Sequence, residues 1–429
     1  MKKYLLFILT VLFLTSSSHA SYALSDPRLN ANNIFGIHIF DENDLEDAAA
    51  LVNSADGDWG YVTIVIREDE RDKTRWQNAF DKMRKLHLIP IIRLATRQKN
   101  GGWAKPKFED IENWTNFLNS LNWVVENRYI IIGNEPNHAA EWGGEVNPEE
   151  YASYLKSISS ELKSSSNDFF IIPAGFDSAA PNNKIHMSEF LFIKKMINKE
   201  PDIFDFIDGW SSHSYPNPNF SGSVEASGAN TIKSYLWELT LLKSLKIKKD
   251  LPVFISETGW VNDTIQMEKL QENWIKAYDF WSNDQNIVAV TPFILNYQEV
   301  PFNKFSWKGS DGFYPFYQTV QSMPKKTGEP ARLDKGKLEA TLIPKFIKKD
   351  GKMYGVTILE NTGQVIWQKG SSYQINLDDR TKIETNGPLF FDIEPGHSGI
   401  LLTREINPLN SYKIAPNILG SYLFKEDGS

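Results

Sequence analysis

Two glutamates in this sequence lie one to two residues beyond short apolar runs, a position where parallel α/β folds place reactive side chains. The segment 130–137 reads IIIGNEPN and contains Glu135, and the segment 253–260 reads VFISETGW and contains Glu257. Apolar runs of this kind are typical of strands buried on both faces, as in a parallel sheet covered by helices. Pro136 has no N–H to extend a sheet, so we expect Glu135 at the carboxyl end of its strand.

Two carboxyl groups that face each other across a cleft can hydrolyse a glycosidic bond. One acts as an acid and protonates the leaving oxygen, while the other attacks the anomeric carbon or activates water. The acid needs apolar or acidic surroundings that raise its pKa, whereas its partner must be kept ionised by hydrogen bonds. If Glu135 and Glu257 share one cleft, we expect their carboxyl groups about 5–5.5 Å apart, the separation of a retaining mechanism.

The elements that must position these residues alternate between strand-like and helix-like patterns. The strands are predicted at 34–40, 61–66, 88–94, 129–132, 169–173, 206–211, 253–256 and 287–295. Helical spacing of apolar residues lies between them, in 76–86, 114–121, 151–162, 236–245 and 274–281. Eight such alternations predict a (β/α)8 TIM barrel over 30–325. The alternative, a doubly wound open sheet, has little support because no Gly-x-Gly-x-x-Gly follows the first strand.

Polar residues gather where the predicted strands end, and in a closed barrel all of these ends face one mouth. The set comprises Arg67, Arg93, Asn134, Glu135, Asp177, His213, Tyr215, Glu257, Asn296 and Tyr297. This shared position is the main sequence argument for the barrel and for a site at its mouth.

The segment Asn134-Glu135-Pro136 resembles the acid/base signature that ends strand four in clan A retaining glycoside hydrolases. The segment 256–260 resembles the strand-seven nucleophile of the same clan, in the Glu-Thr-Gly-Trp form of family 17. The resemblance covers about 34–320 and extends to families 5 and 39 of the same clan. It implies that Glu135 is the acid/base, that Glu257 is the nucleophile, and that Asn134 binds the sugar 2-hydroxyl.

Further residues take expected roles from the same resemblance. The segment 213–215 (His-Ser-Tyr) resembles the His-x-Tyr of family 5, which implies a hydrogen bond from Tyr215 to Glu257; His213 could equally be a core histidine. Arg67 ends the second strand and matches the arginine that supports the nucleophile. Arg93, which ends the third strand, is its rival, and either arginine could form an ordinary ion pair at the rim.

One departure from the clan concerns the eighth strand. In clan members this strand commonly ends in a Trp that forms the floor of the subsite where cleavage occurs. Here 291–297 reads TPFILNY, and Tyr297 or the later Trp307 is the expected substitute. Trp142 and Trp260 are close to the glutamates in sequence and are predicted to stack on sugar rings. Trp103, in a Gly-Gly-Trp segment, is a weaker candidate for the same role.

The pattern changes beyond residue 325. Segment 326–336 is rich in Lys, Gly and Pro and is predicted to be a linker, and 337–406 shows short alternating strands typical of a small β-sandwich. Segments 360–367 (ENTGQVIW) and 393–397 (IEPGH) resemble immunoglobulin-like domains related to the central domain of the next-to-BRCA1 protein. Such domains often serve as spacers. We interpret 407–429 as an extended tail.

The composition excludes several other functions. The chain of 429 residues has no cysteine, which rules out disulfides, thiolate nucleophiles and Cys-ligated zinc. Its net charge of −8 gives a nucleic-acid role little support, and its seven histidines form no metal motif, so we expect neither metal nor other cofactor. The carbohydrate substrate is the one expected partner, and the protein is expected to be a monomer.

The first residues are typical of an export signal. Two lysines precede the apolar run 4–14, and small residues follow up to Ala20, which predicts a signal peptide over 1–20 with cleavage after Ala20 or Ala23. Eleven apolar residues are too few to span a bilayer comfortably, so we expect a secreted or extracytoplasmic protein without a membrane span.

Two further functions remain compatible with the sequence. A catalytically idle sugar-binding or wall-attached protein could use the same barrel, and a transglycosylase would use the same two glutamates.

Overall fold

The computed structural model describes residues 24–99 and 101–331, and beyond them the segments 339–349, 352–361, 373–376, 382–384, 398–405 and 421–426 with residues 367, 369, 392 and 393. The predicted signal peptide 1–20, residues 332–336 of the predicted linker and residues 407–420 lie outside this range. Among the described residues, no helix combines the length and apolar character needed to cross a membrane.

Eight parallel strands form the inner layer of the N-terminal part. They are β1 (Gly36–Ile39), β2 (Gly60–Arg67), β3 (Leu88–Ala95), β6 (Arg128–Ile132), β7 (Phe169–Pro173), β8 (Trp210–His213), β9 (Val253–Glu257) and β10 (Ile287–Val290). Five of them pair in the order β1-β2-β3-β6-β7, and three pair in the order β10-β9-β8. The class is therefore α/β with parallel sheets.

Backbone contacts link the two sheets at both of their junctions. At one junction the Val290 N–H donates to the Ile34 carbonyl (2.9 Å), and Phe35 bridges Val290 in parallel. At the other junction the N–H groups of Asp208 and Gly209 both donate to the Ile171 carbonyl, at 2.8 and 3.2 Å. The carboxyl ends of all eight strands are thereby brought to one side.

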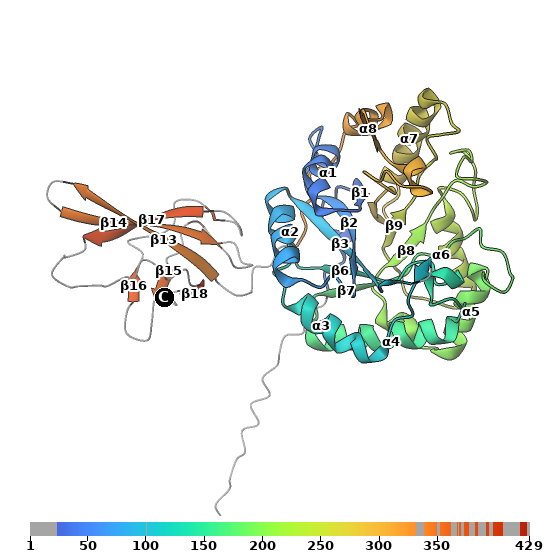
Figure 1. Cartoon of the computed structure of the whole chain (residues 1–429), viewed down its shortest axis with the longest axis horizontal. Coiled ribbons are helices and arrows are strands. Elements are labelled where there is room, and N and C mark those ends of the chain that lie inside the picture. Colours follow the sequence, from blue (N-terminus) through green and yellow to red (C-terminus); the bar gives the residue numbers. More distant parts are fainter. Residues whose placement is uncertain are drawn as a thin grey trace, which may run out of the picture.

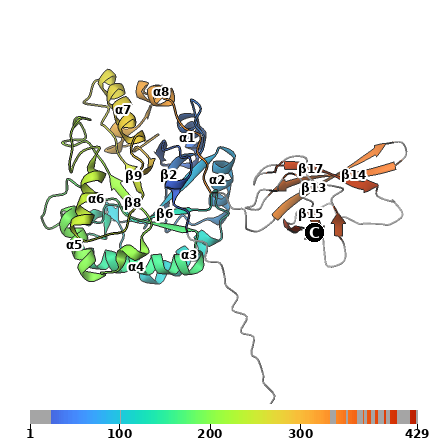
Figure 2. The same cartoon turned by 180° about the vertical axis from the view of Figure 1, so that it is seen from behind.

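Helices cover the outside of the strands (Figure 1, and from behind Figure 2). They are α1 (Leu45–Val52), α2 (Lys73–Lys85), α3 (Ile111–Asn119), α4 (Pro148–Ser165), α5 (Glu189–Lys199), α6 (Ser234–Ser244), α7 (Met267–Ser282) and α8 (Pro315–Gln321). Local chemistry sets their starts: Asp72 caps α2 by accepting the Arg75 N–H (2.9 Å), and Pro148 occupies the first turn of α4. Each helix buries an apolar face against the strands, as Trp76, Phe80 and Met83 of α2 do.

The short elements lie mainly in the connecting loops. They are the hairpins β4–β5 (Gln98–Lys99 and Gly102–Trp103) and β11–β12 (Lys308–Gly309 and Gly312–Phe313), and the 3₁₀ turns η1 (Pro27–Leu29), η2 (Glu42–Asp44), η3 (Phe108–Asp110), η4 (Ala139–Glu141), η5 (Ile203–Phe206) and η6 (Phe302–Phe305).

The sequence placed one strand incorrectly. The predicted strand 206–211 begins four residues too early, because 203–206 form the turn η5 and β8 starts only at Trp210. The apolar residues Ile203, Phe204 and Ile207 are buried but do not pair with neighbouring strands. The strand predicted at 287–295 is also too long, since β10 ends at Val290.

Six antiparallel strands follow the barrel-like part. They are β13 (Glu339–Lys349), β14 (Lys352–Asn361), β15 (Tyr373–Asn376), β16 (Lys382–Glu384), β17 (Ser398–Glu405) and β18 (Ser421–Glu426), in the order β16-β15-β18-β13-β14-β17. Because β18 pairs with both β13 and β15, residues 421–426 of the predicted tail contribute a strand to this sheet. The described strands connect into one sheet, so the two facing sheets of a sandwich stay a prediction.

Candidate active site

Glu257 is the last residue of β9 and lies buried at the strand ends, with 7% of its surface exposed. One guanidinium nitrogen of Arg93, from β3, donates to its Oε1, and the Tyr215 hydroxyl donates to its Oε2 at 3.1 Å. Burial alone would raise the pKa of Glu257, but the charges of His213 and Arg93 and the Tyr215 hydrogen bond lower it to about 2. Glu257 is therefore held as a carboxylate, the form a nucleophile needs.

Glu135 follows β6 and is reached through Gly133, whose φ of +86° a side chain would strain. Glu135 itself has a φ of +29°, an uncommon conformation for a non-glycine residue that costs of order 1–3 kcal/mol. Two backbone hydrogen bonds hold it there, from its own N–H to the Gly175 carbonyl (3.0 Å) and from the His138 N–H to its carbonyl (2.9 Å). The fold thus accepts strain at the residue whose carboxyl group it presents to the site.

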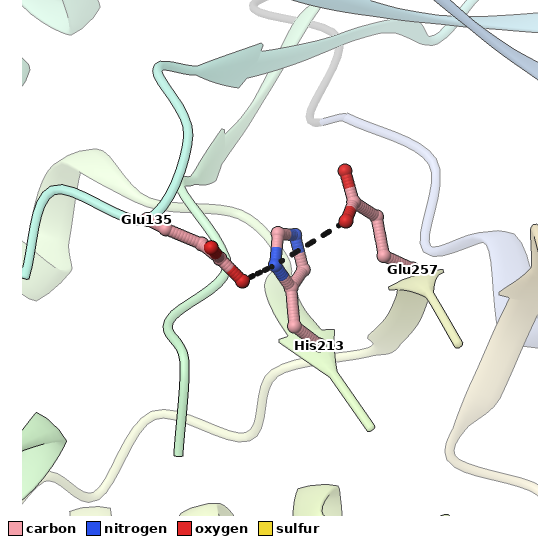
Figure 3. Close-up of side chains that lie close together, drawn as sticks. All are labelled: Glu135, His213 and Glu257. Atoms are coloured by element: carbon pink, nitrogen blue, oxygen red, sulfur yellow. Dashed lines mark hydrogen bonds and ion pairs between the residues drawn. The ribbon is translucent and has the colours of Figure 1, made fainter. Parts of the chain in front are cut away.

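His213, the last residue of β8, stands between the two glutamates (Figure 3). Its Nδ1 lies 2.8 Å from Oε1 of Glu135 and 3.8 Å from Oε2 of Glu257. Burial alone would lower the pKa of His213, yet the two carboxylates raise it above its ordinary value. Gly175 makes room for the ring, since a Cβ there would lie 2.1 Å from its Cδ2.

The two glutamates face the same space. One carboxylate oxygen of Glu135, one of Glu257 and a ring nitrogen of His213 all lie within 4.8 Å of one another. A group of this size could also hold a metal ion. However, the Arg93 cation already balances the Glu257 charge at hydrogen-bonding distance, which favours organic acid–base chemistry over a metal here.

Asn134 joins the two halves of the site. Its Oδ1 accepts from Arg93 Nη1 (2.6 Å) and its Nδ2 donates to Oε2 of Glu141 (3.1 Å), a residue of η4. Burial and the charge of Glu135 raise the pKa of Glu141 to about 7. Glu141 was not among the predicted site residues, and nothing in the sequence beyond its position six residues after Glu135 indicates it.

His38 is a second residue that the sequence analysis missed. It lies in the interior of β1, with 1% of its surface exposed and its Nδ1 4.0 Å from Oε1 of Glu257. Burial and the Arg93 charge lower the pKa of His38 to about 3, so the ring is neutral. A histidine between Ile37 and Ile39 in a buried strand was the available signal, because an apolar strand includes a polar residue only where it has a partner or a task.

The structure decides between the two arginines. Arg67, the predicted supporter of the nucleophile, instead bonds Asp69 (3.0 Å) and Glu70 (3.2 Å). Arg93 takes the place beside Glu257. Arg67 ends β2 and Arg93 lies two residues before the end of β3, and only the Arg93 side chain contacts Glu257.

The predicted tryptophans lie outside the cleft between the glutamates. Trp260 is 3% exposed, packs edge-on against Trp274 and donates to the Gly222 carbonyl (2.9 Å), so it cannot stack on a sugar. Trp307 is equally buried. Trp142 is 3% exposed and donates to Glu150 (3.0 Å); together with the half-buried Trp103 it lines a hollow beside Asn134 and Glu141.

Aromatic residues do follow the eighth strand. Phe293 lies three residues after β10, and its ring centroid is 5.1 Å from that of His38, edge to face. Tyr297 is half-buried and lies further out, between Phe40 and Phe302. Phe293 rather than Tyr297 therefore lies closest to the position expected of the missing Trp.

Comparisons with known proteins give likeness of fold only. No protein-family model and no curated protein matches the sequence. A family 39 glycoside hydrolase from Bacteroides cellulosilyticus WH2 is 17% identical over 89% of this chain and 82% of its own, with a TM-score of 0.48. A monomeric β-xylosidase from Caulobacter crescentus CB15 is 11% identical, over 87% and 97%, with a TM-score of 0.48.

A GH128 endo-β-1,3-glucanase from Sorangium cellulosum is 13% identical over 68% of this chain and 98% of its own, with a TM-score of 0.44. All three TM-scores lie below 0.5 and all three identities below 25%. The function proposed next therefore rests on the geometry of the site.

Proposed function

We propose that this protein is an exported retaining glycoside hydrolase whose eight parallel strands close into a (β/α)8 barrel. The observation that carries the proposal is the pair of glutamates at two strand ends, with oxygens within 4.8 Å across one cleft, of which Glu257 is held ionised by Arg93 and Tyr215. Retaining enzymes need this short separation because the nucleophile must reach the anomeric carbon directly, with no water between.

The reaction proceeds by two displacements. A carboxylate oxygen of Glu257 attacks the anomeric carbon, the glycosidic C–O bond breaks, and the acid form of Glu135 gives its proton to the leaving oxygen. Glu135, now ionised, then removes a proton from water, which attacks the same carbon and releases Glu257. His213, bonded to Glu135, stabilises the charge that Glu135 acquires between the two steps.

The stereochemistry of the first product tests the proposal independently of which sugar is cleaved. Purified protein is screened on 4-nitrophenyl glycosides and on soluble β-1,3-glucan, β-1,4-glucan and β-1,4-xylan, and the anomer released from the best substrate is followed by NMR. We expect retention. Inversion would overturn the retaining mechanism, and turnover that persists in Glu257→Gln would overturn the assignment of the nucleophile.

A matched control is Glu161→Gln, on the exposed face of α4, which should behave as the wild type. If a polysaccharide in a native gel slowed the migration of the protein, but the protein cleaved none of the substrates, the idle sugar-binding function would replace the enzymatic one. If the products were longer than the substrate, the transglycosylase would be favoured.

A further inference from the structure

A row of aromatic rings leads outward from the site along one side of the strand ends. It consists of Phe293, Phe302, Tyr297 and Phe40, which we call the aromatic ridge. Phe40 directly follows β1, and the other three lie in the segment after β10. All four therefore stand at the same end of the strands as Glu135 and Glu257.

The ridge is continuous with the site. The Phe293 centroid is 5.1 Å from that of His38, whose Nδ1 lies 4.0 Å from Glu257. From Phe293 the next centroid is Phe302 at 5.6 Å, followed by Tyr297 at 6.0 Å and Phe40 at 5.1 Å. Neighbouring centroids are thus 5.1–6.0 Å apart, with no break between His38 beside the nucleophile and Phe40.

The outer rings of the ridge are unusually open to solvent. Phe40 is 63% exposed and Phe302 is 45% exposed. Other exposed apolar side chains, such as Ile275 and Phe108, lie on separate elements, as is normal for a protein surface. Contiguous exposed rings beside a cleft are uncommon and mark a place where a ligand covers them.

The base of the ridge is firmly packed. Phe293 and Tyr297 rest on a buried cluster formed by Tyr215, Val261, Ile294 and Phe305. The rings are thus held in place before a ligand arrives, which reduces the entropy lost on binding.

The surroundings of the ridge indicate the chemistry of its ligand. Amide side chains border it at Asn296 and Gln298, which can exchange hydrogen bonds with hydroxyl groups. Acidic residues stand beside its ends, Asp41 next to Phe40 and Glu299 in the exposed part of the loop. Two lysines of the same loop already have partners, since Lys304 Nζ lies over the Phe220 and Phe305 rings and Lys308 pairs with Asp47 at 2.7 Å. Flat apolar rings with amides and carboxylates alongside therefore suit uncharged sugar rings better than a polyanion.

We infer that the aromatic ridge is a row of subsites for successive sugar rings of an uncharged polysaccharide, running from Glu257 out to Phe40. This inference rests on the proposed function and extends it, since it makes the substrate a long chain bound over several units on this side of the cleavage point. An enzyme built only for a terminal sugar or a disaccharide would gain nothing from Phe40.

The test compares substrates of different length. Wild type, the double variant Phe40→Ala/Phe302→Ala and the control Val300→Ala are assayed on the best aryl glycoside and on the best polysaccharide of the panel. Val300 is 81% exposed on the same loop but has no ring. We expect the double variant to lose about 10-fold in kcat/KM on the polysaccharide, mainly through KM, and far less on the aryl glycoside.

Activity that is kept in Phe40→Trp but lost in Phe40→Leu, which keeps apolar bulk without a flat ring, would distinguish stacking from loss of apolar bulk. If the double variant lost kcat/KM equally on both substrates, or lost none on the polysaccharide, the aromatic ridge would not be a row of sugar subsites, and the proposed function would be unaffected. If the wild type cleaved nothing, the proposed function would fall, and the ridge would be tested by retardation of Glu257→Ala in native gels that contain each polysaccharide. The proposed subsites would be overturned if the retardation did not depend on Phe40 and Phe302, or if none of the three polysaccharides retarded the protein.

Discussion

The ends of β9 and β6 each present one glutamate to the same cleft, but their surroundings differ. Glu257 is 7% exposed and receives hydrogen bonds from Arg93 and Tyr215, with His213 and His38 close by. Glu135 is half-buried, and within the described part of the chain His213 is the one side chain that bonds its carboxyl group. Cationic and hydroxyl donors therefore concentrate on one glutamate of the pair.

This difference shows how one residue type can serve two roles. A carboxylate surrounded by donors stays ionised and can act as a nucleophile, whereas one that faces the cleft with a single partner can exchange a proton with the substrate. Another carboxyl group, Glu141, lies on the Glu135 side and is linked to it through Asn134. The four predictions below test this asymmetry, beginning with the largest expected effect.

Removal of the nucleophile should have the largest effect. We expect Glu257→Ala to lose about 10⁴-fold or more in kcat on every substrate, because no glycosyl-enzyme intermediate can form. Added azide should occupy the vacated space and attack from the side of the missing carboxylate, which gives a glycosyl azide of inverted configuration. The product is identified by NMR, and a retained azide product from this variant would place the nucleophile elsewhere.

Removal of the acid should have a smaller effect that depends on the leaving group. We expect Glu135→Ala to lose about 10²–10⁴-fold on a poor leaving group and to keep its first step on a dinitrophenyl glycoside, which needs little protonation. The intermediate should accumulate as a burst, and azide should accelerate its breakdown to a product of retained configuration. If the two alanine variants responded to azide alike, the asymmetry between the strand ends would carry no functional meaning.

Much of this arrangement is predictable from sequence, because a buried parallel strand and its polar end have distinct compositions. The runs 130–132 and 253–255 are short and apolar, a polar residue and a glutamate follow each, and the structure places strands β6 and β9 there. The hydrogen bond from Tyr215 to Glu257 also agrees with its expected contact.

Side-chain direction is what the sequence could not supply. Strands buried on both faces lack the polar alternation that reveals which residues point inward, so Arg67 and Arg93 looked equivalent. Nearness in sequence does not bring Trp142 and Trp260 into the cleft, because both rings are buried by packing and hydrogen-bonded to Glu150 and Gly222. Glu141 and the aromatic ridge depend on loop paths, which no periodic pattern encodes.

The third prediction uses the two arginines as a matched pair. Lysine keeps the positive charge but is shorter than arginine and lacks the planar guanidinium whose Nη1 donates to both Asn134 and Glu257. We expect Arg93→Lys to lower kcat/KM about 10²-fold, the usual effect of removing one oriented donor from an active site. Arg67→Lys, whose partners are Asp69 and Glu70, should change kcat/KM less than twofold, and equal losses in both variants would restore Arg67 to the site.

The smallest effect concerns Glu141 and is one of stability. Its pKa rises from 4.5 to about 7 on folding, so between these values the unfolded chain releases a proton that the folded chain keeps, and stability falls as pH rises. Glu141→Gln has no proton to release and keeps an acceptor for Asn134. In urea titrations the free energy of unfolding of Glu141→Gln relative to wild type should increase between pH 4.5 and 7 by on the order of 2 kcal/mol, less any screening at the exposed edge of the side chain.

Two controls sharpen this prediction. Glu112→Gln, on the exposed face of α3, should show no such increase with pH. The increase for Glu141→Gln should be smaller in a Glu135→Gln background, because the Glu135 charge that helps to raise the pKa of Glu141 is gone. A difference that is constant with pH would mean that Glu141 is ionised in the folded protein, and the acid half of the cleft would then be more strongly charged than we infer.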